Sequence, residues 1–409
     1  MTLAAYSEGF EQFAAGLPVE QRPARREQFG RFLAAGFPTP RIEEWHYTDL
    51  APLSERRFSS AVERGTPAPA VELLADADRL IYINGQLDRA HSSAPELHAE
   101  NLVTHESGDS VTALNGAFAM GGLSLQLGRN EQRSRPLQVL AAGIAGNTPT
   151  MVHQRHRIAL GENAEATVVF QFLGQGAERL TTQVIEIDLA PGARLSLYRL
   201  QDEHADATLL TRIDARLHRA SRLEAVVVDC GTGLVRHDFN VVLAEPGSEV
   251  VLSGLYQPAP GGHVDNQTRI IHAAPHCRSR EYFKGIIDAK ARAIFVGKVV
   301  VQPGAQKTDS EQHVANLLLS RKAEVNAKPE LEIYADDVKC AHGATVGQLD
   351  ETALEYLRSR GVAAAEARAL LLRAFGSEVL DKNAIPALRQ SLAARLGLGA
   401  EDSFEEIAA

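Results

Sequence analysis

The chain has 409 residues, of which 44% are hydrophobic and 23% charged, as is typical of a globular protein with a large buried core. No apolar run approaches the roughly 18 residues that a membrane helix needs, and the first residues lack the basic and then apolar pattern of a secretory signal. The net charge is −10 and basic residues are interleaved with acidic ones, so the sequence indicates neither a nucleic-acid-binding surface nor a membrane protein.

Residues 1–78 are predicted to form an N-terminal helical domain. In PARREQFGRFLAAGFP, the aromatic residues Phe29 and Phe32 recur at helical spacing together with Leu33. Gly36 follows where a helix C-terminus favours a left-handed residue, and a proline two residues later prevents continuation. The Pro-, Gly- and Ala-rich stretch between about 60 and 78 is typical of a linker.

Residues 79–345 are predicted to form a β-rich core, interrupted near its start by the helix-like DSVTALNGAFA. Pro-Gly turns at residues 191, 246 and 303 are 55 and 57 residues apart, and intermediate turn signals halve this spacing to about 28 residues. Because no long helix fits between consecutive strands, a doubly wound sheet is disfavoured. The repeat favours a β-solenoid, most simply a β-helix, over the alternative of a large β-sandwich.

Residues 346–409 are predicted to be helical again. VAAAEARALLLRAFG carries one apolar stripe that includes Leu370, Leu371 and Phe375, and Leu380 follows it. IPALRQSLAARLG carries a second stripe, with a proline in the first helical turn. From the residues alone, these helices either cap the solenoid or dock a partner, and capping is the more common role.

The three cysteines, Cys230, Cys277 and Cys340, are far apart and form no CxxC pair. An odd number of scattered thiols argues against a disulfide framework, and we expect a reducing, cytoplasmic compartment. Three thiols also cannot supply the four-cysteine cradle typical of an iron–sulfur cluster. A metal site on this chain would therefore need ligands from elsewhere.

The segment DDVKCAHGATVG places Cys340 two residues before His342. If this segment is a strand, both side chains point to the same side, with their Cα atoms about 7 Å apart. A thiolate and an imidazole can hold half of a tetrahedral metal site, which a partner chain or a transient cluster would have to complete. A buried thiol beside a hydrogen-bonded histidine explains the same residues, so both interpretations stay open here.

Other candidates for chemistry are weaker. GGHVDNQTRIIHAAPHCRSR is dense in histidine, but its spacing matches no metal motif, and we expect its polar side chains to pack against loops. The adjacent pair Asp336 and Asp337 would face opposite sides of a strand, whereas a retaining glycosidase needs two carboxyl groups about 5 Å apart. The sequence contains no GxxxxGK[ST], GxSxG or HExxH motif, and we expect a protein that is not an enzyme.

Several long segments resemble the SufB/SufD family, the scaffold subunits of the SUF iron–sulfur cluster assembly machinery. They are PTPRIEEWHYTDL (38–50), EYFKGIIDAKARAIFVGKVVVQPGAQKTDSEQ (281–312), NLLLSRKAEVNAKPELEIYADDVKCAHGATVGQLDE (316–351) and YLRSRGV (356–362). Within this family, Gly343 and the low cysteine count favour the SufD branch over the SufB branch, which tends to read Cys-x-His-Glu-Ala here.

The resemblance implies a right-handed parallel β-helix between two helical domains. It implies pairing with SufB through the β-helix and with the ATPase SufC through the C-terminal helices, with Leu370, Leu371, Phe375 and Leu380 as candidate SufC contacts. His342 is the first and Cys340 the second candidate ligand of a transient iron–sulfur cluster shared with SufB, and no tightly bound cofactor is expected in the isolated chain. A homodimer of the isolated chain is compatible with the family, and a β-helix carbohydrate-active enzyme is the alternative function.

Overall fold

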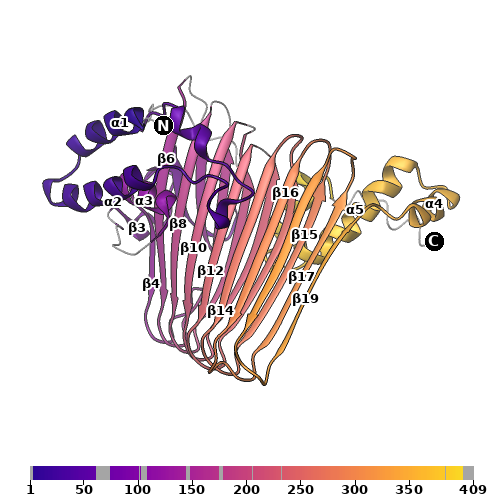
Figure 1. The fold of residues 1–409 in the computed structure, drawn as a ribbon. Helices are drawn as coiled ribbons and strands as arrows, with labels where there is room; N and C mark the ends of the chain where they lie inside the picture. The colour runs from indigo at the N-terminus through magenta and orange to yellow at the C-terminus, as the bar shows by residue number, and fades with distance from the viewer. Residues whose placement is uncertain are drawn as a thin grey trace.

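The protein is described by a computed structural model that covers residues 3–60, 74–100, 102, 108–143, 148–174, 178–204, 206–231, 233–382 and 384–398. In this part of the chain, two long sheets lie face to face as a β-solenoid, and helices cover part of the outer face of each (Figure 1). The predicted β-helix core between N-terminal and C-terminal helices is therefore confirmed.

The described strands form two sheets, one from each side of the solenoid. Sheet A has the order β18-β16-β14-β12-β10-β8-β6-β4-β3, and sheet B has the order β19-β17-β15-β13-β11-β9-β7-β5-β1-β2. The strands of sheet A are β3 (His98–Ala99), β4 (Gly122–Leu127), β6 (Thr150–Leu160), β8 (Arg179–Leu189), β10 (Ala207–Leu217), β12 (Leu234–Leu243), β14 (His263–His272), β16 (Arg292–Val301) and β18 (Glu324–Ile333). Those of sheet B are β1 (Asp78–Ile83), β2 (Gln86–Leu87), β5 (Leu137–Gly143), β7 (Glu165–Gly174), β9 (Arg194–Asp202), β11 (Arg222–Gly231), β13 (Glu249–Pro258), β15 (Arg278–Ile287), β17 (Asp309–Leu318) and β19 (Lys339–Gly347).

Neighbouring coils pair in parallel and in register. For example, β14 pairs with β16 over ten residues, and β15 pairs with β17 over ten residues. A left-handed backbone conformation recurs in the turns between coils, at Asn163, Gly192, Ala220, Gly247, His276 and Lys307. The predicted turns at 191 and 246 therefore mark the repeat, whereas in the third Pro-Gly turn the left-handed residue is Lys307.

One apolar core fills the space between the two sheets. It is built from the inward side chains of successive coils, such as Leu223, Val250 and Phe283. Because side chains of a strand alternate, every second residue faces this interior and the others face outward. Full burial of one such aliphatic side chain contributes about 1.5–3 kcal/mol to the stability of the fold, and each further coil adds buried side chains of the same kind.

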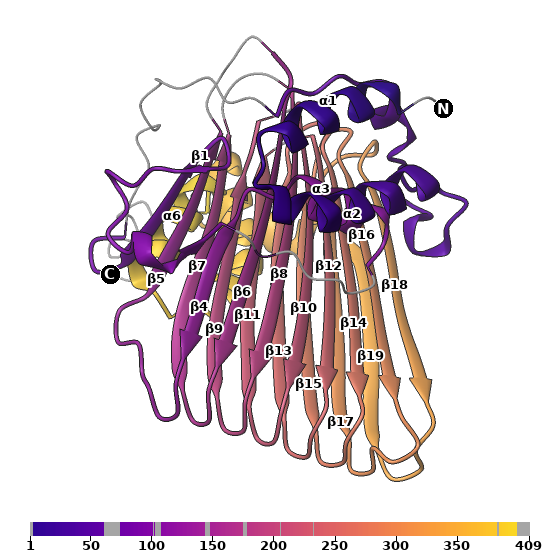
Figure 2. The same cartoon turned by 90° about the vertical axis from the view of Figure 1, so that its left-hand side faces the viewer.

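The N-terminal helices lie on the outer face of sheet A (Figure 2). They are α1 (Ala4–Ala15) and α2 (Arg22–Ala35), and they pack with α3 (Ser110–Phe118), the helix predicted inside the β-rich region. Phe10, Phe29 and Phe118 form the centre of this cluster, which rests on Met151 and Leu180 of the sheet. The helix α2 ends at Gly36, whose positive φ of 68° matches the predicted C-terminal signal.

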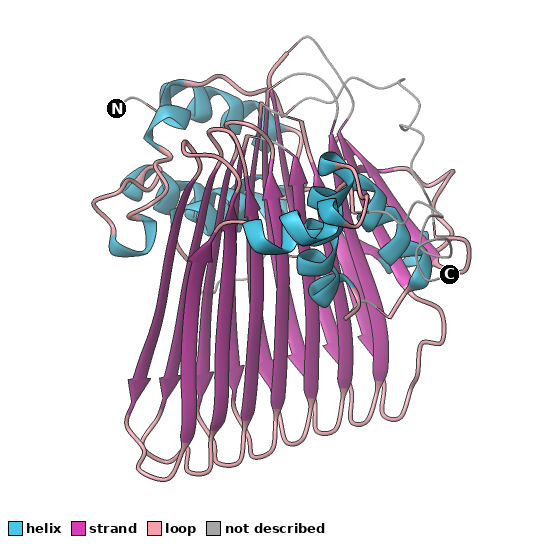
Figure 3. Cartoon of the chain, turned by 90° about the vertical axis from the view of Figure 1, so that its right-hand side faces the viewer, coloured by secondary structure: helices cyan, strands magenta, loops and turns pink. Residues whose placement is uncertain are grey.

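The C-terminal helices are α4 (Glu351–Ser359), α5 (Ala364–Leu380) and α6 (Pro386–Arg395). The second half of α5 and α6 cover the outer face of sheet B through a cluster that includes Val379, Leu380, Leu388 and Val228 (Figure 3). By contrast, α4 projects away from the sheets (Figure 1). Much of the linker predicted between residues 60 and 78 lies outside the described residues, and the two boundaries between the three predicted domains stay predictions.

Candidate functional site

The two ends of the solenoid differ. At the first coils, short antiparallel strands extend the sheets, β2 next to β1 and β3 next to β4. At the last coil, β18 and β19 are the outermost strands of sheets A and B, so each has one edge unpaired in the described part of the chain. Large apolar side chains are exposed there: Ile333 is 41% exposed, Tyr334 61% and Val346 52%. An uncovered strand edge with exposed apolar groups is a ready surface for pairing with another chain.

Cys340 and His342 lie on β19 and face the interior side of this open end. The register pairs Ser310 with Cys340 and Gln312 with His342, and both residues of β17 are buried inward residues. Because residues in register on parallel strands point to the same side of a sheet, Cys340 and His342 share one face, as strand alternation predicts. Cys340 is half-buried and packs against the interior core, whereas His342 is exposed.

The surroundings of Cys340 act on its thiol in two directions. Burial raises the pKa of Cys340 and is the larger effect, and the nearby Asp309 carboxylate raises it further. The backbone of Ser310, hydrogen-bonded to the sulfur, lowers it. The Ser310 backbone thus favours the thiolate of Cys340, whereas burial and the Asp309 carboxylate favour the protonated thiol.

A buried acidic side chain lies two coils behind His342. Glu281 on β15 is in register with Gln312, and the Gln312 Nε2 donates to Glu281 Oε2 over 2.6 Å. Burial raises the pKa of Glu281 to about 7. His342 is therefore the exposed end of a column whose inner members are polar and buried.

The other two thiols are in different surroundings. Cys230 on β11 lies under the C-terminal helices, and its Sγ donates to the Gln201 carbonyl over 3.2 Å. Burial raises the pKa of Cys230 to about 12. Cys277 is buried in the turn before β15 and donates to the Glu245 carbonyl over 3.3 Å. Among the described residues, no group of three or more His, Cys, Asp or Glu side chains is placed to hold a metal ion.

The histidine-dense segment does not converge on one point. His263 and Asp265 face outward from sheet A, where Thr48 Oγ1 contacts both, at 2.9 Å and 2.5 Å. His272 faces the interior and contacts Ser279 Oγ, and His276 occupies a turn with φ of 61°. These residues pack separately, in line with the expectation from their spacing.

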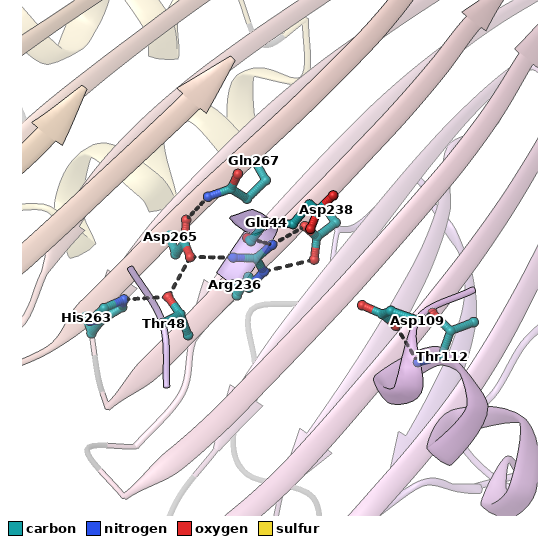
Figure 4. Close-up of polar contacts among 9 residues, drawn as sticks. All are labelled: Glu44, Thr48, Asp109, Thr112, Arg236, Asp238, His263, Asp265 and Gln267. Atoms are coloured by element: carbon teal, nitrogen blue, oxygen red, sulfur yellow. Dashed lines mark hydrogen bonds and ion pairs between the residues drawn. The ribbon is translucent and has the colours of Figure 1, made fainter. Parts of the chain in front are cut away.

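The outward group belongs to an ionic network that sequence reasoning missed (Figure 4). Arg236 Nη1 donates to Asp265 Oδ2 over 2.7 Å, Nη2 donates to Asp238 over 2.7 Å and to the Glu44 carbonyl over 2.8 Å. The guanidinium also stacks on Trp45, 3.9 Å from the ring centroid. The network fastens the segment 38–50 to sheet A. The contacts that join this segment to the sheet link residues 192 to 217 positions apart, so no local sequence pattern predicts them.

The four predicted SufC contacts occupy three kinds of position on α5. Leu380 is buried in the cluster against sheet B, and Phe375 packs against that cluster, with its carbonyl accepting from Lys284 Nζ over 3.0 Å. Leu370 and Leu371 are half-exposed and lie outside the core clusters of the described chain. Nothing in the structure tests the docking role, and of the four residues only Leu370 and Leu371 lie outside the cluster against sheet B.

The carboxylate pair Asp336 and Asp337 lies in the turn between β18 and β19. Asp336 and Asp337 are exposed, and Asp337 forms an ion pair with Lys307. No helix within the described ranges is long and apolar enough to cross a membrane.

Comparison with known proteins identifies relatives across almost the whole chain. Residues 143–375 match a family model described as SUF system FeS cluster assembly, SufBD core domain. The iron–sulfur cluster assembly protein SufD of Escherichia coli is 31% identical over 399 residues, covering 93% of this chain and 93% of that protein. An iron–sulfur cluster assembly SufBD family protein of Synechocystis is 30% identical over 87% of this chain and 86% of its own length. The SufD protein of Bacillus subtilis is 23% identical over 86% and 87%.

Proposed function

The chain belongs to the SufBD family of SUF iron–sulfur cluster assembly proteins, on its SufD side, and from this premise we propose that it is a non-enzymatic scaffold subunit. In this proposal it pairs with a SufB subunit through the last coil of its solenoid and with the ATPase SufC through its C-terminal helices. His342 and, second, Cys340 are ligands of a nascent iron–sulfur cluster. That cluster is the cargo of the assembly, shared with SufB and passed on.

The observation that carries the proposal is the open end of the solenoid. An exposed imidazole and a half-buried thiol share one face of an unpaired edge strand, rimmed by exposed Ile333, Tyr334 and Val346. Edge strands pair readily with strands of another chain, and their main-chain hydrogen bonds supply affinity. A second solenoid docked on this edge would cover the apolar rim and bring its own ligands to His342.

An incomplete ligand set fits a shared, transient cluster. Iron–sulfur clusters are held mainly by cysteine thiolates, and histidine replaces cysteine in some of them. The described part of this chain places no third His, Cys, Asp or Glu beside the pair, so the partner must complete the coordination. Ligands divided between two subunits allow the cluster to be released when the subunits move apart.

The C-terminal helices suit a second docking role. Lys284 holds the C-terminal half of α5 on sheet B by an ion pair with Glu378, at 2.9 Å. The first half of α5, with Leu370 and Leu371, and the projecting α4 lie outside that packing (Figure 1). Because the sequence has no GxxxxGK[ST] loop, ATP hydrolysis belongs to SufC in this proposal. SufC can change the conformation of the scaffold only if it binds the two conformations of the scaffold with different affinities.

The alternative, a carbohydrate-active β-helix enzyme, is not favoured. The adjacent carboxylates occupy an exposed turn, with Asp337 engaged by Lys307, and aromatic residues make up only 6% of the chain. Retaining and inverting glycosidases both need two carboxyl groups that converge on one sugar bond.

Co-expression with the SufB and SufC of the native host tests the proposal. A tagged chain should retain both proteins through affinity purification and size-exclusion chromatography. Recovery of the tagged chain alone, with SufB and SufC both present and folded in the lysate, would refute it.

A further inference from the structure

Two of the three methionines of the chain, Met120 and Met151, line a single cavity together with His153. The cavity has a volume of about 20 Å³, which is enough for one water molecule or one small ion. It lies where the N-terminal helices cover sheet A (Figure 2). Met151 and His153 are two residues apart on β6 and share its outer face, and Met120 follows the helix α3. The backbone N–H of Met120 donates to the His153 carbonyl over 3.2 Å, which holds the third residue beside the strand.

The imidazole of His153 is held firmly and has one ring nitrogen left over. The ring stacks on Phe118 of α3, with the centroids 5.4 Å apart, and Nδ1 lies 2.7 Å from Thr182 Oγ1. His153 is 3% exposed, and its Nε2 has no hydrogen-bond partner among the described residues. A buried polar atom without a partner costs about 1–3 kcal/mol, so Nε2 at this cavity points to a ligand.

The contacts of Thr182 suit a metal-binding histidine. Thr182 Oγ1 accepts from Asn115 Nδ2 over 2.9 Å, and a hydroxyl oxygen has a second lone pair for the Nδ1–H of His153. With the hydrogen on Nδ1, the lone pair of Nε2 is free to bind a metal ion. Histidines that bind metals almost always donate their other ring N–H to an acceptor, which fixes the tautomer and the orientation of the ring.

The other walls of the cavity are uncharged. No Asp, Glu, Lys or Arg is among the described residues that line it, and Phe13, Phe118 and Val152 make part of the lining apolar. The turn after β1 closes the cavity from one side: Gly85 has a φ of 83°, and a side chain there would come within 2.7 Å of Val152. Glycine thus lets the turn approach the strand. Without carboxylates, the cavity does not suit the hard cations Mg²⁺ and Ca²⁺, which prefer oxygen ligands.

We propose that Met120, Met151 and His153 form a binding site for Cu(I), with two thioether sulfurs and Nε2 as its ligands. Soft sulfur donors select Cu(I), and imidazole also suits copper. Methionine side chains are flexible enough for both sulfurs to turn toward one ion. The more ordinary role of methionine, filling gaps in a core, explains Met151, which is 5% exposed. It explains neither Met120, which is 46% exposed, nor the unpartnered nitrogen of His153.

This site is separate from the candidate cluster ligands. It uses β6, near the first coils of sheet A, whereas His342 and Cys340 lie on β19, the last strand of sheet B. The exposed Met120 gives an ion access from the outer face of the solenoid. The site therefore goes beyond the proposed function and does not depend on it.

The test is anaerobic titration of Cu(I) into the folded full-length chain, with bicinchoninate as the competing chelator. The background is the variant with Cys340→Ser and His342→Ala, because a thiolate also binds Cu(I). We expect one Cu(I) per chain, and an affinity at least about tenfold weaker in Met120→Leu and in His153→Phe. Leucine keeps the volume of methionine and phenylalanine keeps the ring on Phe118, so both variants should fold.

Selenomethionine labelling distinguishes thioether ligands from thiols. X-ray absorption at the selenium edge should show a copper neighbour in the loaded background variant. Met120→Leu combined with Met151→Leu leaves Met1 as the only labelled residue and should abolish that signal. The matched control is His46→Ala, which removes an exposed histidine outside the cavity and should change neither the affinity nor the selenium spectrum.

Three results would overturn the site: no Cu(I) binding by the background variant, an undiminished affinity in Met120→Leu and His153→Phe, or a selenium spectrum without copper at full loading. Because the titration uses the chain without SufB or SufC, its failure leaves the proposed function standing. Failure of the co-purification test would leave the copper site standing in the same way.

Discussion

Gln312 on β17 lies in register with His342 on β19, so the exposed imidazole at the end of the solenoid continues a buried polar column. Behind Gln312, the same column contains Glu281, which is 3% exposed. A single coil thus separates the candidate ligand, at the surface, from a carboxyl group enclosed in the core.

Glu281→Gln should remove a pH dependence of stability. The ordinary glutamate pKa is 4.5, and in the folded protein burial raises the pKa of Glu281 to about 7. Below pH 4.5 both states hold the proton, whereas between pH 4.5 and 7 only the folded state does, so stability falls as the pH rises. The decrease should approach about 3 kcal/mol. The measurement is urea unfolding of both proteins at pH 5 and pH 8. The free energy of unfolding of Glu281→Gln, relative to that of the native chain, should be higher at pH 8 than at pH 5. If the free energies of unfolding of the two proteins differ by the same amount at pH 5 and pH 8, Glu281 is already ionised in the folded protein over this range.

Arg236→Ala should destabilise the protein by about 3–5 kcal/mol, because it leaves the fully buried Asp265 charge without its guanidinium partner. Trp45 is the only tryptophan and stacks on Arg236, so its fluorescence reports release of the segment 38–50. The control is Arg212→Ala, which breaks a bidentate but partly exposed pair with Asp214 and should cost less than about 1 kcal/mol. An equal loss of unfolding free energy in the two variants would show that the network in Figure 4 contributes no more to stability than a surface ion pair.

Leu370→Asp combined with Leu371→Asp should release SufC on co-purification while SufB stays bound. Both leucines are half-exposed on the first half of α5, so a charge there disturbs a partner more than the fold. Leu380→Ala is the contrasting variant, since it empties a buried position and should lower the free energy of unfolding by about 2–5 kcal/mol. SufC that still co-elutes with the double variant would place its docking surface elsewhere.

The repeat of the solenoid could be predicted because its turns have a chemical signature. Gly192 and Gly247 adopt the left-handed conformation that the Pro-Gly pairs suggested, and Ala220 does so at the predicted half-way point. The signature is incomplete, because Lys307 and His276 adopt the same conformation without a glycine. Strand alternation likewise placed Cys340 and His342 on one face.

What could not be predicted depends on residues that are distant in sequence. Ser279 and Ser310 are 31 residues apart and meet only because one coil stacks on the next. Thr48 and Asp265 are 217 residues apart. An apolar pattern on a helix does not show what covers each residue, so Leu370 and Leu380 were both candidate SufC contacts although only Leu380 is buried.

His342→Ala should leave the complex with SufB and SufC assembled but lower its cluster content. The imidazole is exposed, and no described residue hydrogen-bonds to it, so its removal should cost the fold little. The matched control is His313→Ala, which removes a neighbouring exposed histidine from β17 that stacks on Tyr282, away from the interior face.

The most direct measurement is absorption and Mössbauer spectroscopy of the complex purified without oxygen, with native chain, His342→Ala and His313→Ala in parallel. The account predicts cluster signals in the native and His313→Ala complexes and their loss, or a marked decrease, in His342→Ala. A His342→Ala complex with the full native signal would contradict the claim that this imidazole completes a coordination shell shared between two subunits.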